Sequence, residues 1–242
     1  MLVVDRFYRD FTSTPRWITY RVKIESSDLY IRTNGDFSSF VKKKLIKLRK
    51  DVKTEIKRCP DFLTSFRPLS PRFSHVPKVV KLMYDASKKA GVGPMAAVAG
   101  AIAHIIGEEL SKKNQEVIVE NGGDIYINVK KEIKTTIFAG DSPFSGKIGL
   151  KIFPDLSPVG VCTSSGSVGH SLSFGRADGF TVISKDTALA DAVATAGANK
   201  IRSKRDVENA ISFAMSIPGV LGTVAIYKDV IGAKGLIELC EI

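Results

Sequence analysis

The first third of the chain alternates between apolar and polar positions with two different periods. From Arg16 to Thr33, side chains such as Ile18, Tyr20, Val22 and Ile24 alternate with polar or bulky neighbours, with a break at residues 26–28. Period-two alternation around a polar break predicts a β-hairpin. From Val41 to Arg58, apolar residues recur at helical spacing and lysines fill the other face, so we expect a helix that ends before Pro60.

The same patterns continue to the end of the chain. In the first half they predict helices at 79–90 and 96–110, strands at 117–119 and 125–127 around a turn at 121–124, and a strand at 134–139. In the second half they predict strands at 148–153 and 180–183, helices at 186–199 and 206–216, and strands at 220–227 and 235–242 that pair with each other. Residues 1–140 and 141–242 thus share one order of two strands, two helices and two strands. We expect a single α+β domain built of two similar halves.

Length and composition fit a globular protein. The chain has 242 residues, of which 44% are hydrophobic, so it can bury a core without disulfides or metals. Its start, MLVVDRFYRDF, lacks the apolar core of a signal peptide, and no run of about 18 apolar residues occurs. We therefore expect a cytoplasmic protein with no membrane segment.

The net charge of +11 lies entirely in the first half. Residues 1–140 hold 26 Lys and Arg against 15 Asp and Glu, whereas residues 141–242 hold 10 of each kind. The lysine-rich helix at 41–58 could attract nucleic acid, anionic lipid or an acidic protein. A solvated helix face is the more ordinary interpretation, and since no aromatics are interleaved with the lysines we do not expect nucleic-acid binding.

The cysteines give little evidence of special chemistry. Cys59, Cys162 and Cys240 are far apart and form no CxxC pair, so neither a zinc site nor a disulfide framework is predicted. Cys162 adjoins the loop described next, and the simplest role for it is that of a small buried apolar residue.

A cluster of small hydroxyl residues and glycines begins at Thr163. Thr163, Ser164, Ser165 and Gly166 open a stretch that runs to His170, and glycines in such a loop let backbone N–H groups approach an anion such as a phosphate. The alternative is an ordinary surface loop, because Ser and Gly clusters are common between elements.

The helix predicted at 186–199 carries a lone charge on an otherwise apolar surface. Asp186 and Thr187 fit its N-cap, and Asp191 and Thr195 are four residues apart and share a face. A buried, unpaired carboxylate is costly, so Asp191 needs a partner. A carboxylate and a hydroxyl can together hold Mg²⁺, which prefers oxygen ligands and takes phosphate or water as the others.

Three segments carry a resemblance to a known family. ALADAVATA, which contains Asp191 and Thr195, resembles the ADxxAT segment of the ApbE flavin transferases. AGVGPMAAVAGAIA, which contains Gly93 and Met95, is similar to a signature of a cytoplasmic branch of the ApbE-like superfamily, found mainly in archaea and anaerobic bacteria. The turn at residues 121–124 resembles the NxGGD segment of the family, although an Asn-Gly hairpin turn would look the same.

The resemblance implies both a fold and a site. The fold is a tandem T-fold of duplicated ββααββ units with antiparallel sheets and packed helices, with a ligand cleft between the halves. Asp191 and Thr195 would bind Mg²⁺, and FAD or FMN would lie against residues of three segments: Gly93 and Met95; Asn121, Gly122, Gly123 and Asp124; and Thr163, Ser164, Ser165 and Gly166. Laid on the family's GIAKGYAVD helix, the segment AVAGAIAH at residues 97–104 places Ala99 at the Lys and His104 at the Asp.

The implied function is binding of a flavin or related pyrophosphate ligand with Mg²⁺ in this cleft. FMN transfer and FAD hydrolysis are the reactions that such a protein could catalyse, and a carrier without catalysis is the other form of the same hypothesis. In a transferase, Mg²⁺ would polarise the FAD pyrophosphate while a Ser or Thr hydroxyl of an acceptor protein attacks phosphorus and AMP leaves. His170 is a candidate base or phosphate contact, because its pKa suits proton transfer near neutral pH, and Asp178 is a candidate helper. A homo-oligomer is compatible with this function.

Two alternatives remain. Members of this branch have been associated with homocysteine biosynthesis in anaerobes, so the chain could be a helper or sulfur-handling enzyme that acts with an iron–sulfur protein partner, with Cys162 as the residue of interest. The other alternative is a binding module that uses its basic surface.

Overall fold

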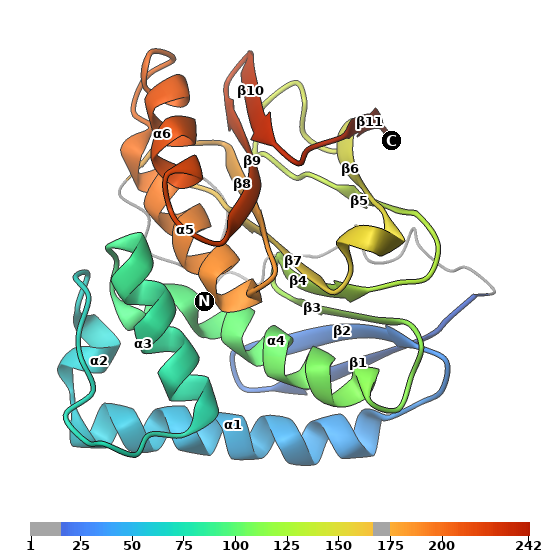
Figure 1. Cartoon of the computed structure of the whole chain (residues 1–242), viewed down its shortest axis with the longest axis vertical. Helices are drawn as coiled ribbons and strands as arrows, with labels where there is room; N and C mark the ends of the chain where they lie inside the picture. The colour runs from blue at the N-terminus through green and yellow to red at the C-terminus, as the bar shows by residue number, and fades with distance from the viewer. Residues whose placement is uncertain (1–15, 167–174) are drawn as a thin grey trace.

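The computed structural model describes residues 16–166 and 175–242. Within them, eight strands form one antiparallel sheet in the order β1-β2-β3-β4-β7-β8-β9-β10, shown in Figure 1. These strands are β1 (Ile18–Ile24), β2 (Ser27–Thr33), β3 (Val117–Asn121), β4 (Asp124–Asn128), β7 (Val159–Ser164), β8 (Gly179–Ser184), β9 (Val220–Tyr227) and β10 (Val230–Gly235).

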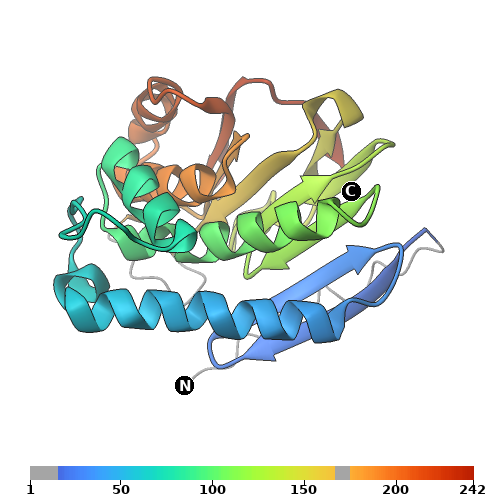
Figure 2. The ribbon, with the colours of Figure 1, turned by 60° about the horizontal axis from the view of Figure 1, so that its bottom comes forward.

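The longer helices cover one face of this sheet, as Figure 2 shows for α1, in front of the blue β1–β2 hairpin, and for α4, in front of the green strands. The helices are α1 (Ser38–Arg58), α2 (Asp61–Thr64), α3 (Lys78–Ala90), the 3₁₀ turn η2 (Pro94–Ala97), α4 (Val98–Ser111), α5 (Thr187–Lys200) and α6 (Asp206–Met215). The larger hydrophobic core lies between them and the sheet.

The sheet is assembled from two similar units. In the first, β1 and β2 are followed by helices α1 to α4 and then by β3 and β4. In the second, β7 and β8 are followed by α5 and α6 and then by β9 and β10. Antiparallel pairing of β4 with β7 joins the units into one sheet. The predicted α+β architecture of duplicated ββααββ units is confirmed, with extra helices in the first unit, whereas a division near residue 140 stays a prediction.

A smaller sheet covers part of the opposite face. It has the order β11-β6-β5, with β5 (Ile133–Thr136), β6 (Ile148–Ile152) and β11 (Leu239–Glu241), and the 3₁₀ turn η3 (Pro154–Leu156) follows β6. The second hydrophobic core, which includes Ile127, Leu150, Ile152 and Val161, lies between the two sheets.

Two predicted strand assignments were wrong. The strand predicted at 148–153 exists, but it belongs to the small sheet, and β7 takes its place in the second unit. Only the start of the segment 235–242 pairs with β9, through Gly235 and Leu236. The main partner of β9 is β10, across a turn at Lys228 and Asp229, and β11 pairs with β6. Strand partners far apart in sequence are set by which apolar faces meet, and the local pattern carries no information about that.

Most of the basic helix follows its predicted pattern. Val41, Leu45, Leu48 and Val52 are buried, as expected from their spacing. Glu55 is buried as well, with 1% of its surface exposed, because its carboxylate accepts a hydrogen bond of 2.7 Å from the Tyr84 hydroxyl. Burial and the bond to Glu55 together raise the pKa of Tyr84.

Of the described helices, none is long and apolar enough on its own to cross a membrane. Only the pair Lys78–Ala90 and Pro94–Ser111, taken together across a bend of 107°, meets the length and composition criterion.

Candidate functional site

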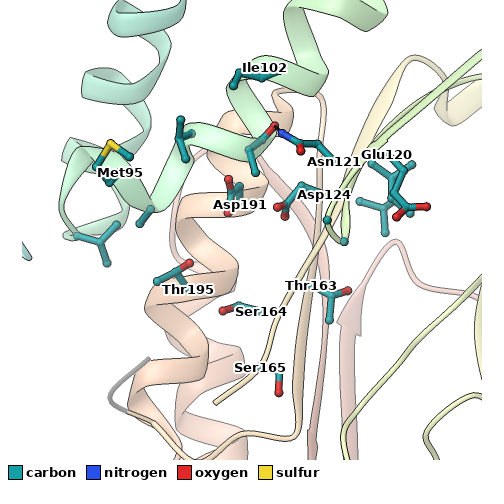
Figure 3. Close-up of a pocket in the computed structure, with 18 of the residues that line it drawn as sticks. Met95, Ile102, Glu120, Asn121, Asp124, Thr163, Ser164, Ser165, Asp191 and Thr195 are labelled. Atoms are coloured by element: carbon teal, nitrogen blue, oxygen red, sulfur yellow. Dashed lines mark hydrogen bonds between the residues drawn. The ribbon is translucent and has the colours of Figure 1, made fainter. Parts of the chain in front are cut away.

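One large cleft collects residues from both units. Its volume is about 1390 Å³, and Figure 3 shows that α4, α5, the β3–β4 turn and β7 contribute to it. The predicted site residues that line it are Gly93, Met95, Asn121, Gly122, Gly123, Asp124, Thr163, Ser164, Ser165, Asp191 and Thr195. Segments up to about a hundred positions apart in the sequence therefore meet at one place.

The cleft continues around the end of the main sheet. Residues two positions apart on a strand point to the same face of the sheet. Asn121 therefore shares a face with Val119, and Asp124 with Tyr126, and both of these partners are buried in the larger core under the helices. Ile125 belongs to the smaller core on the opposite face and also lines the cleft. The β3–β4 turn lies between these two parts. Gly122 and Gly123 have φ of 77° and 126°, which other residues rarely adopt.

Asp191 stands on α5 and points at the start of α4. Its Oδ2 accepts a hydrogen bond of 2.8 Å from the Gly100 N–H, and only 9% of the residue is exposed. The first N–H groups of a helix have no partner within the helix, and Ala97, at the N-cap of α4, offers no side-chain acceptor. Asp191 therefore caps α4 from another helix.

A second carboxylate lies beside the first. Figure 3 shows Asp124, on β4, and Asp191 pointing toward one another. Burial raises the pKa of Asp191 well above its ordinary value, the nearby Asp124 raises it further, and the backbone N–H groups of Gly100 and Ala99 oppose this shift. Asp124 is half-buried and Asp191 is buried, and two carboxylates this close are stabilised by a shared proton or by a cation.

Close packing of α4 on α5 makes this geometry possible. A Cβ built on Gly100 would lie 2.4 Å from the Thr187 carbonyl oxygen and 2.7 Å from the Asp191 Cβ. Only glycine allows the two helices to approach this closely. On the other side of α4, the Asn121 side chain donates to the Ala99 carbonyl at 3.1 Å and ties α4 to β3.

The oxygens at this end of the cleft are of the kind that Mg²⁺ prefers as ligands. Asp191 and Thr195 are one turn apart on α5, both line the cleft, and Thr195 is 8% exposed. With Asp124 they supply two carboxylates and a hydroxyl, and Mg²⁺ is commonly bound by one or two carboxylates with phosphate and water. No group of three or more His, Cys, Asp and Glu side chains suited to a metal occurs in residues 16–166 and 175–242.

The predicted phosphate loop is partly a strand. Thr163 and Ser164 belong to β7, so their side chains point to opposite faces of the sheet. The Thr163 hydroxyl lies 2.8 Å from the Thr181 hydroxyl on the face opposite the helices, while Figure 3 shows Ser164 toward Thr195. The loop begins only at Ser165. Gly166 does not line the cleft, and its N–H donates to the Ala177 carbonyl at 2.8 Å.

Neither candidate catalytic residue is among the described residues that line the cleft. His170 lies outside the described residues. Asp178 precedes β8 and does not line the cleft; its Oδ2 accepts a hydrogen bond from the Lys228 N–H in the β9–β10 turn. Lys228 has φ of 55°, so this contact supports a strained turn.

Cys162 and His104 make contacts with Thr187 at the start of α5. Cys162 is fully buried, with its Sγ 3.4 Å from the Thr187 carbonyl oxygen, and burial raises the pKa of its thiol well above the ordinary value. A thiol held in its protonated form is a poor nucleophile. His104 Nδ1 accepts a hydrogen bond of 3.4 Å from the Thr187 N–H at the start of α5.

Several residues of the cleft were not predicted. Arg49 and Lys53 of α1 line it and both bond the Glu25 carboxylate, at 2.6 Å each. The strand β5 lines it along its whole length. The basic character of α1 was visible in the sequence, but nothing there indicated that these two cations face a cleft.

Comparison with known proteins places the chain among relatives along nearly its full length. A family model described as AbpE bacteria matches residues 9–230. A UPF0280 protein of Methanocaldococcus jannaschii is 38% identical over 91% of this chain and 92% of its own length. A UPF0280 protein of Methanothermobacter thermautotrophicus is 40% identical over 88% and 84%.

Solved structures show the same fold at low sequence identity. A mutant of the flavin transferase ApbE from Vibrio cholerae superposes with a TM-score of 0.57 at 13% identity, over 90% of this chain and 97% of that one. The ApbE protein of Thermotoga maritima gives a TM-score of 0.53 at 11% identity, over 90% and 96%. The predicted ApbE-like fold is confirmed.

Proposed function

The chain belongs to the AbpE bacteria family, a distant relative of the ApbE flavin transferases, and on this premise we propose that its cleft binds a flavin dinucleotide together with Mg²⁺. The observation that carries the proposal is the meeting of Asp191 and Thr195 with the β3–β4 turn in one cleft of about 1390 Å³. Ligand pockets commonly measure about 300–1,000 Å³, so the cleft has room for a dinucleotide.

The pyrophosphate fits beside the β3–β4 turn. Gly122 and Gly123 present backbone without side chains at this point, and Ser164 and Ser165 add hydroxyl groups on the β7 side. Asp191, Thr195 and Asp124 would hold Mg²⁺, which neutralises phosphate charge and polarises the phosphorus–oxygen bond. Without a cation, the two carboxylates would repel a pyrophosphate, so the metal is needed for this ligand.

The reaction that we propose for this cleft is transfer of FMN to a hydroxyl group. The hydroxyl oxygen of a Ser or Thr on an acceptor protein bonds the phosphorus of the FMN half, and the bond from that phosphorus to the bridging oxygen breaks. AMP leaves with the bridging oxygen, and the hydroxyl proton is released. With water in place of the acceptor, the same displacement is FAD hydrolysis and yields FMN and AMP.

The alternatives find less support in the geometry. A sulfur-handling role through Cys162 would need an accessible thiolate, and this thiol is buried with a raised pKa. Binding of a polyanion by α1 remains a prediction that no contact of the described residues favours.

Calorimetry with FAD and MgCl₂, combined with chromatography of released AMP, tests the proposal. We expect Mg²⁺-dependent FAD binding and AMP release, and an Asp191→Asn variant that lowers Mg²⁺ affinity by about 10–100-fold. Asp85→Asn is the matched control, because Asp85 is exposed on α3 and pairs with Lys81. Wild-type protein that binds no FAD, or Asp191→Asn protein equal to the control, would contradict the proposal.

A further inference from the structure

The strand β5 is the edge of the small sheet, and it lies along the cleft. The order of that sheet is β11-β6-β5, so among the described strands β5 pairs with β6 only. Every residue from Ile133 to Phe138 lines the cleft. The side of β5 that β6 does not use therefore faces the cleft.

The hydrogen bonds to β6 identify the backbone groups on that open side. The Ile137 N–H donates to the Ile148 carbonyl at 2.9 Å, and the Ile137 carbonyl accepts from the Gly146 N–H at 3.0 Å. In an antiparallel pair, successive residues point their N–H and C=O groups to alternate sides. Thr135 thus bonds toward β6, and the N–H and C=O groups of Lys134 and Thr136 point away from it. These outward groups pair with no other strand in residues 16–166 and 175–242.

The open side of β5 leads to the proposed phosphate site. Ala139, just beyond β5, packs on the start of β8: a Cβ built on Gly179 would lie 3.2 Å from the Ala139 Cβ. Thr163 and Thr181 line the same part of the cleft. An extended chain beside β5 would therefore lie next to β7 and the β3–β4 turn.

The size and charge of the region fit a second reactant. The cleft of about 1390 Å³ exceeds the usual range for a single ligand of about 300–1,000 Å³. Basic side chains outnumber acidic ones along the cleft: Arg32, Arg49, Lys53, Lys134 and Lys200 line it together with Glu120, Asp124 and Asp191. An approaching segment is therefore favoured if it is acidic.

We propose that the open edge of β5 binds an extended acidic segment of the acceptor protein by strand addition and so brings a Ser or Thr hydroxyl to the phosphate site. Main-chain hydrogen bonds supply the affinity in such complexes and tolerate different side chains. The inference rests on the proposed FMN transfer, for which it names the binding mode of the acceptor.

Two substitutions at Thr136 separate the contribution of its backbone N–H to peptide binding from that of its side chain. Thr136→Pro removes an outward N–H that β6 does not use, and proline is accepted on an edge strand in this orientation. Thr136→Ala changes the side chain and keeps the N–H. Each reaction contains FAD, MgCl₂ and a pool of ten-residue peptides. Every peptide has one central threonine and aspartates near each end, and its other positions are randomised. A pool with alanine in place of the central threonine is the negative control.

Mass spectrometry of the peptides and chromatography of AMP give separate readouts. We expect the wild type and Thr136→Ala to add FMN to threonine peptides at similar rates. Thr136→Pro should do so at least about tenfold more slowly, on the scale of one or two lost hydrogen bonds, with AMP release into water unchanged. Equal labelling by Thr136→Pro overturns the inference, as does AMP release by wild type without labelling of any threonine peptide.

Hydrogen exchange on the wild type covers the case in which Thr136→Pro does not fold. The amides of Lys134 and Thr136 should gain protection when the best-labelled peptide is added, and unchanged exchange at both overturns the inference. Absence of AMP release and of FAD binding would instead show that the proposed function itself has failed.

Discussion

The helices α4 and α5 both contribute side chains to the cleft, and their N-termini are capped in different ways. At α5, Asp186 stands directly before the helix and accepts from the N–H groups of Ala188 at 2.9 Å and Leu189 at 3.3 Å. At α4, the chain supplies no cap of its own, and Asp191 accepts from Gly100, 91 positions away, at 2.8 Å. The first carboxylate is explained by its neighbours in the sequence, whereas the second is explained only by the tertiary fold.

The difference separates an ordinary cap from a site residue. Asp186 has a single structural task at the start of α5. Asp191 stands in the interior of α5, and it lies beside Asp124 at the cleft. A carboxylate has about four lone-pair positions on two oxygens, so Asp191 can cap α4 and also bind a cation. The comparison predicts that perturbing the α4 end changes stability and metal binding together, and that perturbing the α5 end changes stability alone.

The largest effect is expected from filling the α4–α5 crossing. Gly100→Val places carbon atoms where a Cβ alone would lie 2.4 Å from the Thr187 carbonyl oxygen, so the helices must separate and Asp191 must lose its N–H partner. We expect a loss of about 3 kcal/mol in the free energy of unfolding, or about 6–12 °C in Tm, together with loss of Mg²⁺ binding.

A valine at another glycine controls for the substitution itself. Gly35→Val meets only the Phe37 ring, at 3.3 Å from the new Cβ, and should change stability by less than about 1 kcal/mol. Calorimetric melting of both variants gives the measurement. Equal losses in the free energy of unfolding of the two variants would show that the α4–α5 crossing is no more sensitive to a valine than an ordinary turn.

The pH dependence of stability tests whether the buried Asp191 carboxylate is destabilising when it is ionised and no cation is bound. The pKa of Asp191 is raised in the folded protein by burial and by Asp124, so the folded state holds a proton at pH values where the unfolded chain has lost it. Without metal, the contribution of the Asp191 proton to the free energy of unfolding is therefore fully present below the pKa of an aspartate in the unfolded chain, about 3.9. This contribution is lost as the pH rises through the pKa of Asp191 in the folded protein. The slope can reach about 1.4 kcal/mol per pH unit.

Urea unfolding at a series of pH values measures this slope. Asp191→Asn should flatten it, because the amide does not titrate, and saturating MgCl₂ should reduce it in the wild type by binding the ionised form. Wild type and Asp191→Asn with the same pH profile would show that the Asp191 proton does not govern stability in this range.

The parts of the fold that were predictable depend on local patterns. Alternation over residues 16–33 and the helical spacing in 41–58 gave the hairpin and α1, and Asp186 was recognisable as an N-cap. The placement of Asp191 and Thr195 on one helix face also follows from their spacing alone. In each case, residues a few positions apart determine the outcome.

The parts that could not be predicted depend on pairing between distant segments. The composition of β7 and of the residues just after it is typical of a loop, because glycine, serine and threonine are frequent there. Gly160 instead serves packing, since a Cβ there would lie 2.5 Å from the Thr187 Cα. β6 pairs with β5 and β11 in the small sheet and not with the strands of the second unit. The sequence of β6 alone does not indicate which strands it pairs with. The bond from Gly100 to Asp191 joins two helices, and no local rule connects them.

The smallest expected effect comes from the cap that the sequence does explain. Asp186→Ala removes the acceptor for the N–H groups of Ala188 and Leu189, and loss of an N-cap lowers the free energy of unfolding by about 1 kcal/mol. His104 still accepts from the Thr187 N–H at 3.4 Å, so the helix start keeps one partner. Mg²⁺ titration of this variant should match the wild type, since α4 and Asp191 are untouched. If Asp186→Ala weakens Mg²⁺ binding as strongly as Asp191→Asn does, the two helix ends are not independent, and the position of α5, rather than the carboxylate of Asp191, controls the site.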